Sequence, residues 1–465
     1  MRLLSHVEAS PEQMRILADT RPGFHLVRGA AGSGKTTTAL LRLRQLCATR
    51  LSRRERLQQE EPVRVLVLTY NKTLQGYVAE LARQQVSGSA GLVLRVATFG
   101  KWAVDMVGNE GLVDREQTRP VIRSLAASIT LPSDFIVDEV EYLLGRFGSE
   151  ELDAYLTARR EGRGQAPRVE RSLRKRLLEE VVTPYIAHKE KRGWRDWNDI
   201  AVEARQVESQ PAWDVVIVDE AQDFSANQVR AISSHVSGDH TTTFVMDATQ
   251  RIYPRFFTWS EAGIQLTNAY VLRSNHRNTR QVAAFARGIV EGLPYEDDGT
   301  LPDFLACDRE GPLPVVVDGR FNKQVEYAIQ YLRTEIDLTS QSVAFLHPKG
   351  GAWFDYLRRA LATEGIAWCE LTRASGWPSG PESVALCTVH SAKGLEFDHV
   401  FMLGLNQQVT PHGDEEGDAT LDMLRRLLAM GIGRSRQTVT LGYKADDPST
   451  LIGLLVEGTY KEVRL

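Results

Sequence analysis

The run from residue 29 to residue 36 constrains the fold of this chain more than any other feature, because it reads Gly-Ala-Ala-Gly-Ser-Gly-Lys-Thr. It matches the phosphate-binding loop pattern, in which two glycines bracket four residues and Lys-Thr follows. The apolar run at 24–27 predicts a strand before the loop, and helical spacing of apolar residues over 36–46 predicts a helix after it. This order argues against a glycine-rich turn with a chance lysine, and it predicts an α/β sheet that binds a nucleoside triphosphate.

The loop is expected to bind phosphate through its backbone. N–H groups turn inward around the phosphates, and the helix that follows adds its positive N-terminal end. Lys35 is expected to lie as a point charge on the outer phosphates, and the Thr36 hydroxyl is expected to ligate Mg²⁺. The residues assigned to nucleotide binding here are Gly29, Ala30, Ala31, Gly32, Ser33, Gly34, Lys35, Thr36 and Thr37.

A second motif, Asp-Glu-Ala-Gln-Asp at 219–223, follows the apolar run 215–218, as is typical of an acidic site at the end of a buried parallel strand. Asp219 is the expected Mg²⁺ carboxylate, and Glu220 is the expected group that polarises the attacking water. An acidic pair at a strand end is by itself more often a solvated loop. Here Gln222 and Asp223 follow at once and the phosphate loop is present, so the two motifs together predict hydrolysis of ATP or GTP.

Composition limits the class of protein. A chain of 465 residues is too long for one simple core, so two to four units are expected. The longest apolar runs are strand-sized, far below the roughly 20 residues that cross a membrane, and the N-terminus has no apolar secretory core. The scattered cysteines Cys47, Cys307, Cys369 and Cys387 suggest neither a metal site nor a disulfide framework. These features predict a cytoplasmic protein with no membrane partner.

Charge is ordinary overall. The net charge of −4 argues against a protein that coats nucleic acid by charge alone, whereas the 56 Lys and Arg residues are enough to line a local groove.

Strand-like runs alternate with helical patterns in two blocks, which predicts an α/β fold with two parallel sheets. The expected strands are 24–27, 63–69, 93–97, 215–218 and 243–246 in the first block, and 315–317, 343–346, 385–389, 399–403 and 438–441 in the second. Between residues 101 and about 205 helical periodicity replaces the strand patterns. The expected domains are therefore 1–100 with 206–265 for the first sheet, 101–205 for a helical insertion, and 266–465 for the second sheet.

Further short motifs occur in a fixed order over nearly the whole chain. They are Pro-Glu-Gln at 11–13, Leu-Thr-Tyr-Asn-Lys at 68–72, Ala-Thr-Phe at 97–99, Asp-Ala-Thr-Gln-Arg-Ile-Tyr at 247–253, Leu-Arg-Ser-Asn-His-Arg at 272–277, Thr-Val-His-Ser-Ala-Lys-Gly-Leu-Glu-Phe at 388–397 and Arg-Ser-Arg at 434–436. With the phosphate loop and the acidic motif, this order resembles superfamily 1 helicases of the UvrD/Rep-like kind. The resemblance implies two RecA-like parallel-sheet domains with the helical insertion in the first. It also implies that Gln13 binds the adenine edge, which favours ATP over GTP.

The resemblance implies further roles around the γ-phosphate. Gln250 would contact the γ-phosphate and the attacking water, and Glu396 would bind the ribose. Arg277 and Arg434 would reach across the cleft between the two domains to the γ-phosphate, where such arginines stabilise transition-state charge. His276 takes the place of the aromatic residue that usually stacks on adenine in this family. ATP would then hold the two domains together, and hydrolysis would release them.

The resemblance places a nucleic-acid track across the tops of both sheets. Phosphates are expected to contact Thr69, Asn71, Lys72, Thr98, Thr388 and His390, and bases are expected to stack on Tyr70, Phe99, Tyr253 or Trp259. The segment after Tyr253 differs from the compact Trp-Arg-Gly of relatives, so one stacking role stays open between Tyr253, Phe257 and Trp259.

UvrD-like enzymes usually carry a second, long helical insertion between the strand expected at 343–346 and Thr388. Here only about 40 residues separate the two, and one helix with a Gly/Pro-rich loop at 376–381 uses most of that length. The chain is therefore expected to be a compact form without the second insertion.

The leading hypothesis is an ATP- and Mg²⁺-dependent translocase and helicase on single-stranded DNA, moving 3′ to 5′ as the family does, with RNA as the alternative strand. The second hypothesis is a nucleic-acid-stimulated ATPase switch in a larger repair or defence complex, without productive unwinding. It would report an engaged strand to a partner protein such as a nuclease. Strand release from a tailed duplex separates the two.

Overall fold

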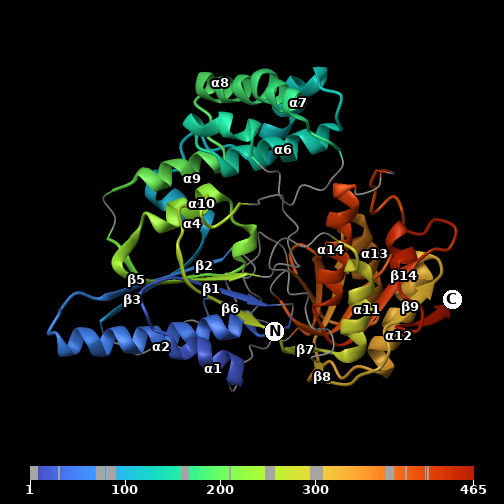
Figure 1. The fold of residues 1–465 in the computed structure, drawn as a ribbon. Coiled ribbons are helices and arrows are strands. Elements are labelled where there is room, and N and C mark those ends of the chain that lie inside the picture. Colours follow the sequence, from blue (N-terminus) through green and yellow to red (C-terminus); the bar gives the residue numbers. More distant parts are fainter. Residues whose placement is uncertain are drawn as a thin grey trace.

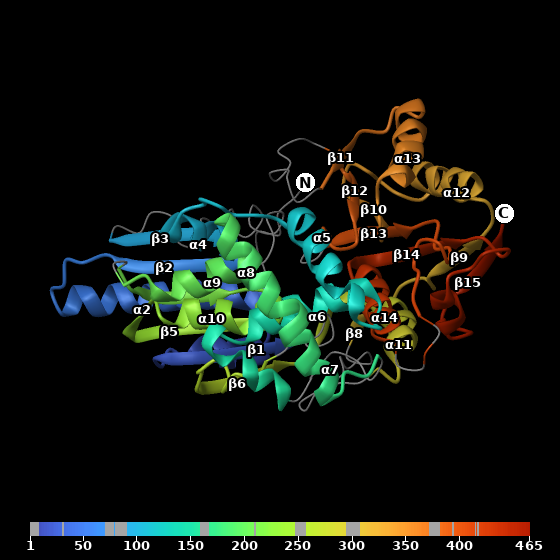
Figure 2. The same ribbon diagram turned by 90° about the horizontal axis from the view of Figure 1, so that it is seen from above.

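The computed structural model describes residues 9–29, 32–69, 79, 91–158, 167–208, 211–246, 257–293, 307–371, 382–392, 395–413, 415 and 418–465. Two α/β bodies lie side by side, and a group of helices stands on the first of them (Figure 1). Figure 2 shows the same arrangement from above, with the first sheet on the left and the second sheet on the right. The α/β class and the two parallel sheets expected from the sequence are confirmed.

The first sheet has six strands in the order β3-β2-β4-β5-β1-β6, and all its pairs are parallel. The strands are β1 (Gly23–Gly29), β2 (Val63–Thr69), β3 (Leu92–Thr98), β4 (Trp213–Val218), β5 (Val236–Met246) and β6 (Leu266–Leu272). Every residue of β4 is buried, as its continuous apolar run predicts for a central parallel strand. One face is covered by α1 (Pro11–Ala18) and α2 (Lys35–Arg56). The other is covered by α4 (Phe99–Val107), α9 (Trp197–Gln206) and α10 (Ala226–Ser233).

The domain boundary expected after residue 265 is wrong. Strand β6 pairs with β1, with Val27 opposite Tyr270 and Gly29 opposite Leu272, so residues 266–272 complete the first sheet. The alternation of strands and helices along the sequence does not say to which sheet a strand at a boundary belongs.

The helices α5 (Arg115–Leu125), α6 (Ser133–Arg146), α7 (Arg171–Arg176) and α8 (Thr183–Arg192) share a core of their own, which includes Val140, Tyr155 and Val181. Short 3₁₀ and π segments join them: η1 (Ala126–Ser128), η2 (Ser149–Leu156) and η3 (Leu177–Val182). The ends of the expected insertion 101–205 differ from this unit. Trp102 of α4 and Ile200 of α9 lie in the core of the first sheet, because the apolar faces of these helices cover β2 and β4.

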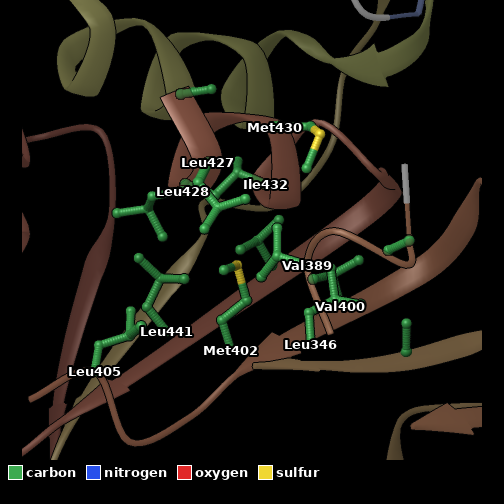
Figure 3. Packing of buried hydrophobic residues seen from close by; sticks show 14 of the residues in the cluster. Leu346, Val389, Val400, Met402, Leu405, Leu427, Leu428, Met430, Ile432 and Leu441 are labelled. Carbon is green, nitrogen blue, oxygen red and sulfur yellow. The ribbon is translucent and has the colours of Figure 1, made fainter. Parts of the chain in front are cut away.

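The second sheet has seven parallel strands in the order β11-β12-β10-β13-β14-β9-β15. They are β9 (Val315–Asp318), β10 (Val343–His347), β11 (Trp368–Glu370), β12 (Val384–Thr388), β13 (Phe397–Met402), β14 (Ser435–Tyr443) and β15 (Lys461–Arg464). Helices α11 (Arg280–Val290) and α14 (Ala419–Ile432) cover one face. Figure 3 shows Leu427 and Ile432 of α14 facing Met402 of β13, with Val389 between them and Val400. Helices α12 (Phe321–Thr334) and α13 (Ala352–Thr363) cover the other. The short edge strands β11 and β15 were not expected, since three or four residues carry no readable period.

Smaller elements complete the described chain: β7 (Asn275–Thr279) pairs with β8 (Cys307–Arg309), η4 (Ala221–Asp223) follows β4, and η6 (Thr450–Leu454) precedes β15. Among the described residues, no single helix has the length and apolar character to cross a bilayer, although the bent pair Arg115–Ser128 and Ser133–Arg146 reaches both together.

Candidate nucleotide and nucleic-acid site

The phosphate loop lies at the C-terminal end of β1 and leads into α2, as predicted. Gly32 and Gly34 have positive φ values of 82° and 76°, which favour glycine. Space excludes a side chain as well: a Cβ on Gly32 would lie 2.1 Å from Asn275 Oδ1 and 2.8 Å from the Cβ of Arg277. A Cβ on Gly34 would lie 2.8 Å from Gln13 Nε2. Ala30 and Ala31 lie outside the described residues.

The start of α2 meets the acidic end of β4. The Thr36 hydroxyl donates a hydrogen bond to Asp219 Oδ2 at 3.0 Å, although 183 residues separate the two in sequence. Burial raises the pKa of Asp219 to about 7, and the charge of Glu220 adds to this effect. A buried carboxylate beside a hydroxyl is an oxygen donor set that suits Mg²⁺, which takes few protein ligands and completes its shell with waters and phosphates.

Glu220 follows in a strained backbone conformation. Its φ of 54° and ψ of 41° are left-handed, and among the described non-glycine residues only Gln58 also has a positive φ. Its N–H donates to Asp219 Oδ1 at 2.9 Å, and its carboxylate accepts a hydrogen bond from Gln222 Nε2. Gln222, which had no assigned role, thus holds the carboxylate of the expected base.

Gln13 lies beside the loop, on α1. Its Nε2 donates to Thr38 Oγ1 at 2.9 Å and to the Gly34 carbonyl at 3.4 Å, and its Oε1 accepts from the Ser10 N–H. Arg42, which the sequence did not single out, is fully buried beneath α1. It donates to the carbonyls of Ile16 and Asp19 at the end of that helix. The signal that could have found it is an arginine on the apolar face of α2.

The connection from β6 to β7 is bound to the phosphate loop. The carboxylate of Glu12 accepts the N–H of Arg273 at 3.0 Å and that of Ser274 at 3.4 Å. The Gly32 carbonyl accepts the N–H of His276 at 2.9 Å, and the His276 side chain is exposed beside the loop. The second block therefore begins in contact with the nucleotide loop.

Arg277, Glu396 and Arg434 lie together in the second domain. Arg277 Nη2 is 2.5 Å from Glu396 Oε1, and its Nη1 donates to the Gly433 carbonyl at 3.2 Å. Burial opposes ionisation of Glu396, but the charge and hydrogen bond of Arg277, together with the charges of Arg436 and Arg434, outweigh it and hold the pKa of Glu396 below its ordinary value. Arg434 is 2% exposed and donates to the carbonyls of Met430 and Leu395. The sequence did not indicate that the expected ribose ligand and cross-cleft arginine would pair.

The expected nucleic-acid residues of the first domain are only partly in place. Thr98 ends β3 and caps α4, and its hydroxyl accepts the Lys101 N–H at 3.2 Å. Thr69 is buried at the end of β2. Phe99 is 3% exposed and packs against Trp102 and Phe224, so its expected role as a stacking platform is corrected: the ring belongs to the core. Tyr70, Asn71, Lys72, Gln250 and Tyr253 lie outside the described residues.

Trp259 is half-buried, with its ring 4.7 Å from Phe244 and 5.8 Å from Phe257. An exposed aromatic residue at this edge that the sequence did not single out is Trp197, which is 41% exposed at the start of α9. A Cβ on Gly100 would lie 2.9 Å from its ring, so Trp197 covers the segment that follows Thr98.

In the second domain Thr388 ends β12, and its Oγ1 accepts the Ser391 N–H at 3.2 Å. It lies in register with His347 of β10. His390 is half-exposed two residues further on. Both expected second-domain contacts therefore lie at the C-terminal edge of the sheet.

Comparison with known proteins agrees with this arrangement. The family model described as UvrD/REP helicase N-terminal domain matches residues 9–269, and the one described as UvrD-like helicase C-terminal domain matches residues 370–446. DNA helicase II of Escherichia coli (strain K12) is 39% identical over 97 residues, which are 18% of this chain and 13% of that protein. ATP-dependent DNA helicase Rep of the same strain is 37% identical over 59 residues (13% and 9%), and ATP-dependent DNA helicase PcrA of Bacillus subtilis (strain 168) is 41% identical over 63 residues (13% and 8%). The matched segments thus span a small part of each of these relatives.

Proposed function

The chain belongs to the UvrD/Rep helicase family, and from this membership and the site we propose that it hydrolyses ATP to move along single-stranded DNA as a 3′-to-5′ translocase and helicase. The observation that carries the proposal is the hydrogen bond between the Thr36 hydroxyl and Asp219. It joins the phosphate loop to the acidic strand end, the two parts that triphosphate hydrolysis needs in one place.

The hydrolytic roles follow from position. Mg²⁺ held by Thr36 and Asp219 would neutralise charge on the outer phosphates when bound. Lys35 adds a second positive charge there, from the first turn of α2. Glu220 takes a proton from the attacking water, while Gln222 fixes the orientation of its carboxylate. Gln13, held beside Gly34, reads the adenine edge.

The motor step uses the Arg277–Glu396 pair. When ATP binds, its γ-phosphate competes with the Glu396 carboxylate for the Arg277 guanidinium. The Glu396 carboxylate that is released then accepts hydrogen bonds from the ribose hydroxyls. Arg434, which is buried immediately before β14, adds a second positive charge near the γ-phosphate from the second domain. Because Arg277 belongs to β7, which is bonded both to the loop and to the second domain, ATP binding draws the domains together.

The strand would cross both sheets at the C-terminal edges of their strands. Thr98 in the first domain, and Thr388 and His390 in the second, contact phosphates. Trp197 takes the stacking role that the buried Phe99 cannot supply.

The second candidate, a strand-stimulated ATPase switch without unwinding, is favoured by one observation. Between β10 and β12 the chain has one helix, α13, and the short edge strand β11 among its described residues, rather than a large subdomain that could grip duplex.

The test compares ATP hydrolysis without nucleic acid, with single-stranded DNA and with RNA, and then strand release from duplexes with a 3′ or a 5′ tail. Stimulation by DNA with release from the 3′-tailed duplex supports the helicase. Stimulation without release from either duplex supports the switch, and no stimulation contradicts both.

A further inference from the structure

Three aromatic side chains gather at the C-terminal edge of the second sheet. Phe321 begins α12 shortly after β9, and Trp353 and Tyr356 lie in the first turns of α13, shortly after β10. The Phe321 ring meets that of Trp353 edge-on at 4.7 Å between centroids, and that of Tyr356 at 5.9 Å. We call these three residues the second-domain platform.

The platform is fixed from beneath. His347 stacks on Trp353 with ring centroids 4.9 Å apart and planes 26° apart. Gly404 lies against the same indole, so that a Cβ there would meet it at 2.6 Å. Phe345 and Phe401 form a buried stacked pair under the helices, at 5.1 Å. Rings held in this way lose little conformational freedom when a ligand stacks on them.

The platform differs from an ordinary aromatic core in its exposure. Tyr356 is 36% exposed, whereas Phe345 and Phe401 are each 1% exposed. Arg359 lies over the Tyr356 ring, with its guanidinium carbon 5.9 Å from the centroid. A core cluster requires neither an exposed ring nor a cation above it.

The charge around the platform is positive in a chain whose net charge is −4. The segments 319–323 and 349–359, which carry the three rings, contain five cations and one carboxylate: Arg320, Lys323, Lys349, Arg358 and Arg359 against Asp355. Arg358 is paired with both Asp355 and Glu370, and Lys323 is paired with Glu326 of the next turn. Arg320, Lys349 and Arg359 are all exposed. Aromatic rings among cations are the composition of surfaces that bind single strands.

The platform adjoins the second-domain end of the strand track. His347, which supports Trp353, lies in register with Thr388 on the neighbouring strand. A Cβ on Gly350 would contact both the Thr388 side chain and the Phe354 ring at 3.1 Å. A DNA strand that contacts Thr388 and His390 therefore reaches Trp353 by crossing the C-terminal end of β10.

We propose that the second-domain platform binds about one or two further nucleotides of the single strand, with bases stacked on Tyr356 and Trp353 and phosphates facing Arg320, Lys349 and Arg359. The inference rests on the proposed function, because it extends the same strand track. It assigns this surface to nucleic acid rather than to a protein partner because of its cations and its continuity with Thr388.

The test uses the full chain and oligothymidylates of increasing length. Tyr356→Ala is expected to bind long oligonucleotides about tenfold more weakly, the usual scale for loss of one stacking ring. Binding of oligonucleotides that are only long enough to reach from Thr98 to Thr388 is expected to stay unchanged. Tyr356→Phe keeps the ring and is expected to bind as the wild type does. Tyr327→Ala, which removes a half-buried tyrosine elsewhere on α12, is the matched control.

A second measurement tests the cations. For long oligonucleotides, log affinity is expected to fall less steeply with log salt in Arg359→Gln. The magnitude of the slope is expected to decrease by about one, because one phosphate contact is lost. Arg333→Gln, at the far end of α12, is expected to leave the slope unchanged. ATP hydrolysis without nucleic acid is expected to be the same in all these variants.

If the wild type and Tyr356→Ala both bind single-stranded DNA, and bind every length equally well, the platform proposal is wrong and the proposed function stands. The exposed ring of Tyr356 would then be assigned to a protein partner. If the wild-type chain binds no strand, the proposed function fails and the platform fails with it.

Discussion

The backbone carbonyl of Gly32 accepts a hydrogen bond from the backbone N–H of His276, at an N···O distance of 2.9 Å, and this bond ties the phosphate loop to the segment that enters the second domain. The same segment is bonded to the second sheet, because Asn278 Nδ2 donates to the carbonyls of Gly433 and Ser435. Residues 276–278 therefore connect the phosphate loop directly to the backbone on both sides of Arg434.

The first prediction tests this junction with Gly32→Ala. A methyl group there would lie 2.1 Å from Asn275 Oδ1, so the loop and β7 must separate. ATP turnover is expected to fall by about two orders of magnitude, the usual effect of a displacement near 1 Å in a catalytic arrangement. Gly458→Ala is the control, because Gly458 has the same φ of 82° and no described atom within 4 Å of the added methyl. Equal activity of the two variants would contradict the role of the contact.

The second prediction concerns Glu220→Gln. Thr36 and Asp219 remain in place, so ATP and Mg²⁺ are expected to bind nearly as in the wild type. Turnover is expected to fall by roughly 10²–10⁴, because the substituted amide accepts no proton from the attacking water. Equilibrium nucleotide binding and single-turnover hydrolysis separate the two effects. A collapse of affinity along with rate would instead make Glu220 a binding residue.

The third prediction concerns Arg277→Ala. Turnover is expected to fall by about 10³ or more, the lower end of the range for an arginine that stabilises a transferring phosphoryl group. Affinity for single-stranded DNA is expected to change little, since Arg277 faces Glu396 and the loop rather than the strand track. Arg280→Ala, three residues further on and paired with Glu310 at the surface, is the control. A variant that loses strand binding first would move Arg277 to the nucleic-acid face.

How far the sequence could predict this arrangement depended on the range of the interactions. The strands and the phosphate loop follow from local apolar runs and glycine spacing, so β1, β4 and their flanking motifs were placed correctly. The assignment of β6 to the first sheet required its pairing partner. The burial of Phe99 and the exposure of Trp197 depend on how α4 and α9 cover that sheet. The Arg277–Glu396 pair joins residues 119 apart in sequence, which no periodicity reports.

The fourth prediction concerns pH and stability. Burial lowers the pKa of His347 and of His240 to about 4, and the nearby charges of Lys349 and Arg50 add to the respective shifts. The pKa of a histidine in the unfolded chain is about 6.5, so between pH 6.5 and pH 4 the unfolded chain binds more protons than the folded chain. The contribution of these two histidines to the free energy of unfolding is therefore fully present above about pH 6.5 and is lost as the pH falls toward 4. The loss is about 2 kcal/mol per histidine at pH 5.

The variant for this prediction is His347→Asn, whose amide oxygen can accept the N–H groups of Lys349 and Gly350 that His347 Nδ1 now accepts. Its free energy of unfolding, measured by urea denaturation, is expected to fall less between pH 7 and pH 5 than that of the wild type. An identical pH dependence in both proteins would show that His347 titrates normally in the folded state.

The last prediction follows from the short connection between β10 and β12. The resemblance to UvrD-like enzymes implies a second insertion at this position that would close over a duplex junction and restrain the monomer, whereas here α13 and the edge strand β11 occupy the described part of that position. The described part of this connection therefore offers no such restraint, and it also offers less surface with which to grip duplex. Strand-stimulated ATP hydrolysis is expected from the monomer, with strong salt dependence because phosphate contacts dominate binding. Unwinding is expected to be weak and limited to short tailed duplexes unless a partner protein is added. Processive unwinding of long duplexes by the monomer would contradict this prediction. It would indicate that the helices α5 to α8 provide the duplex-binding surface.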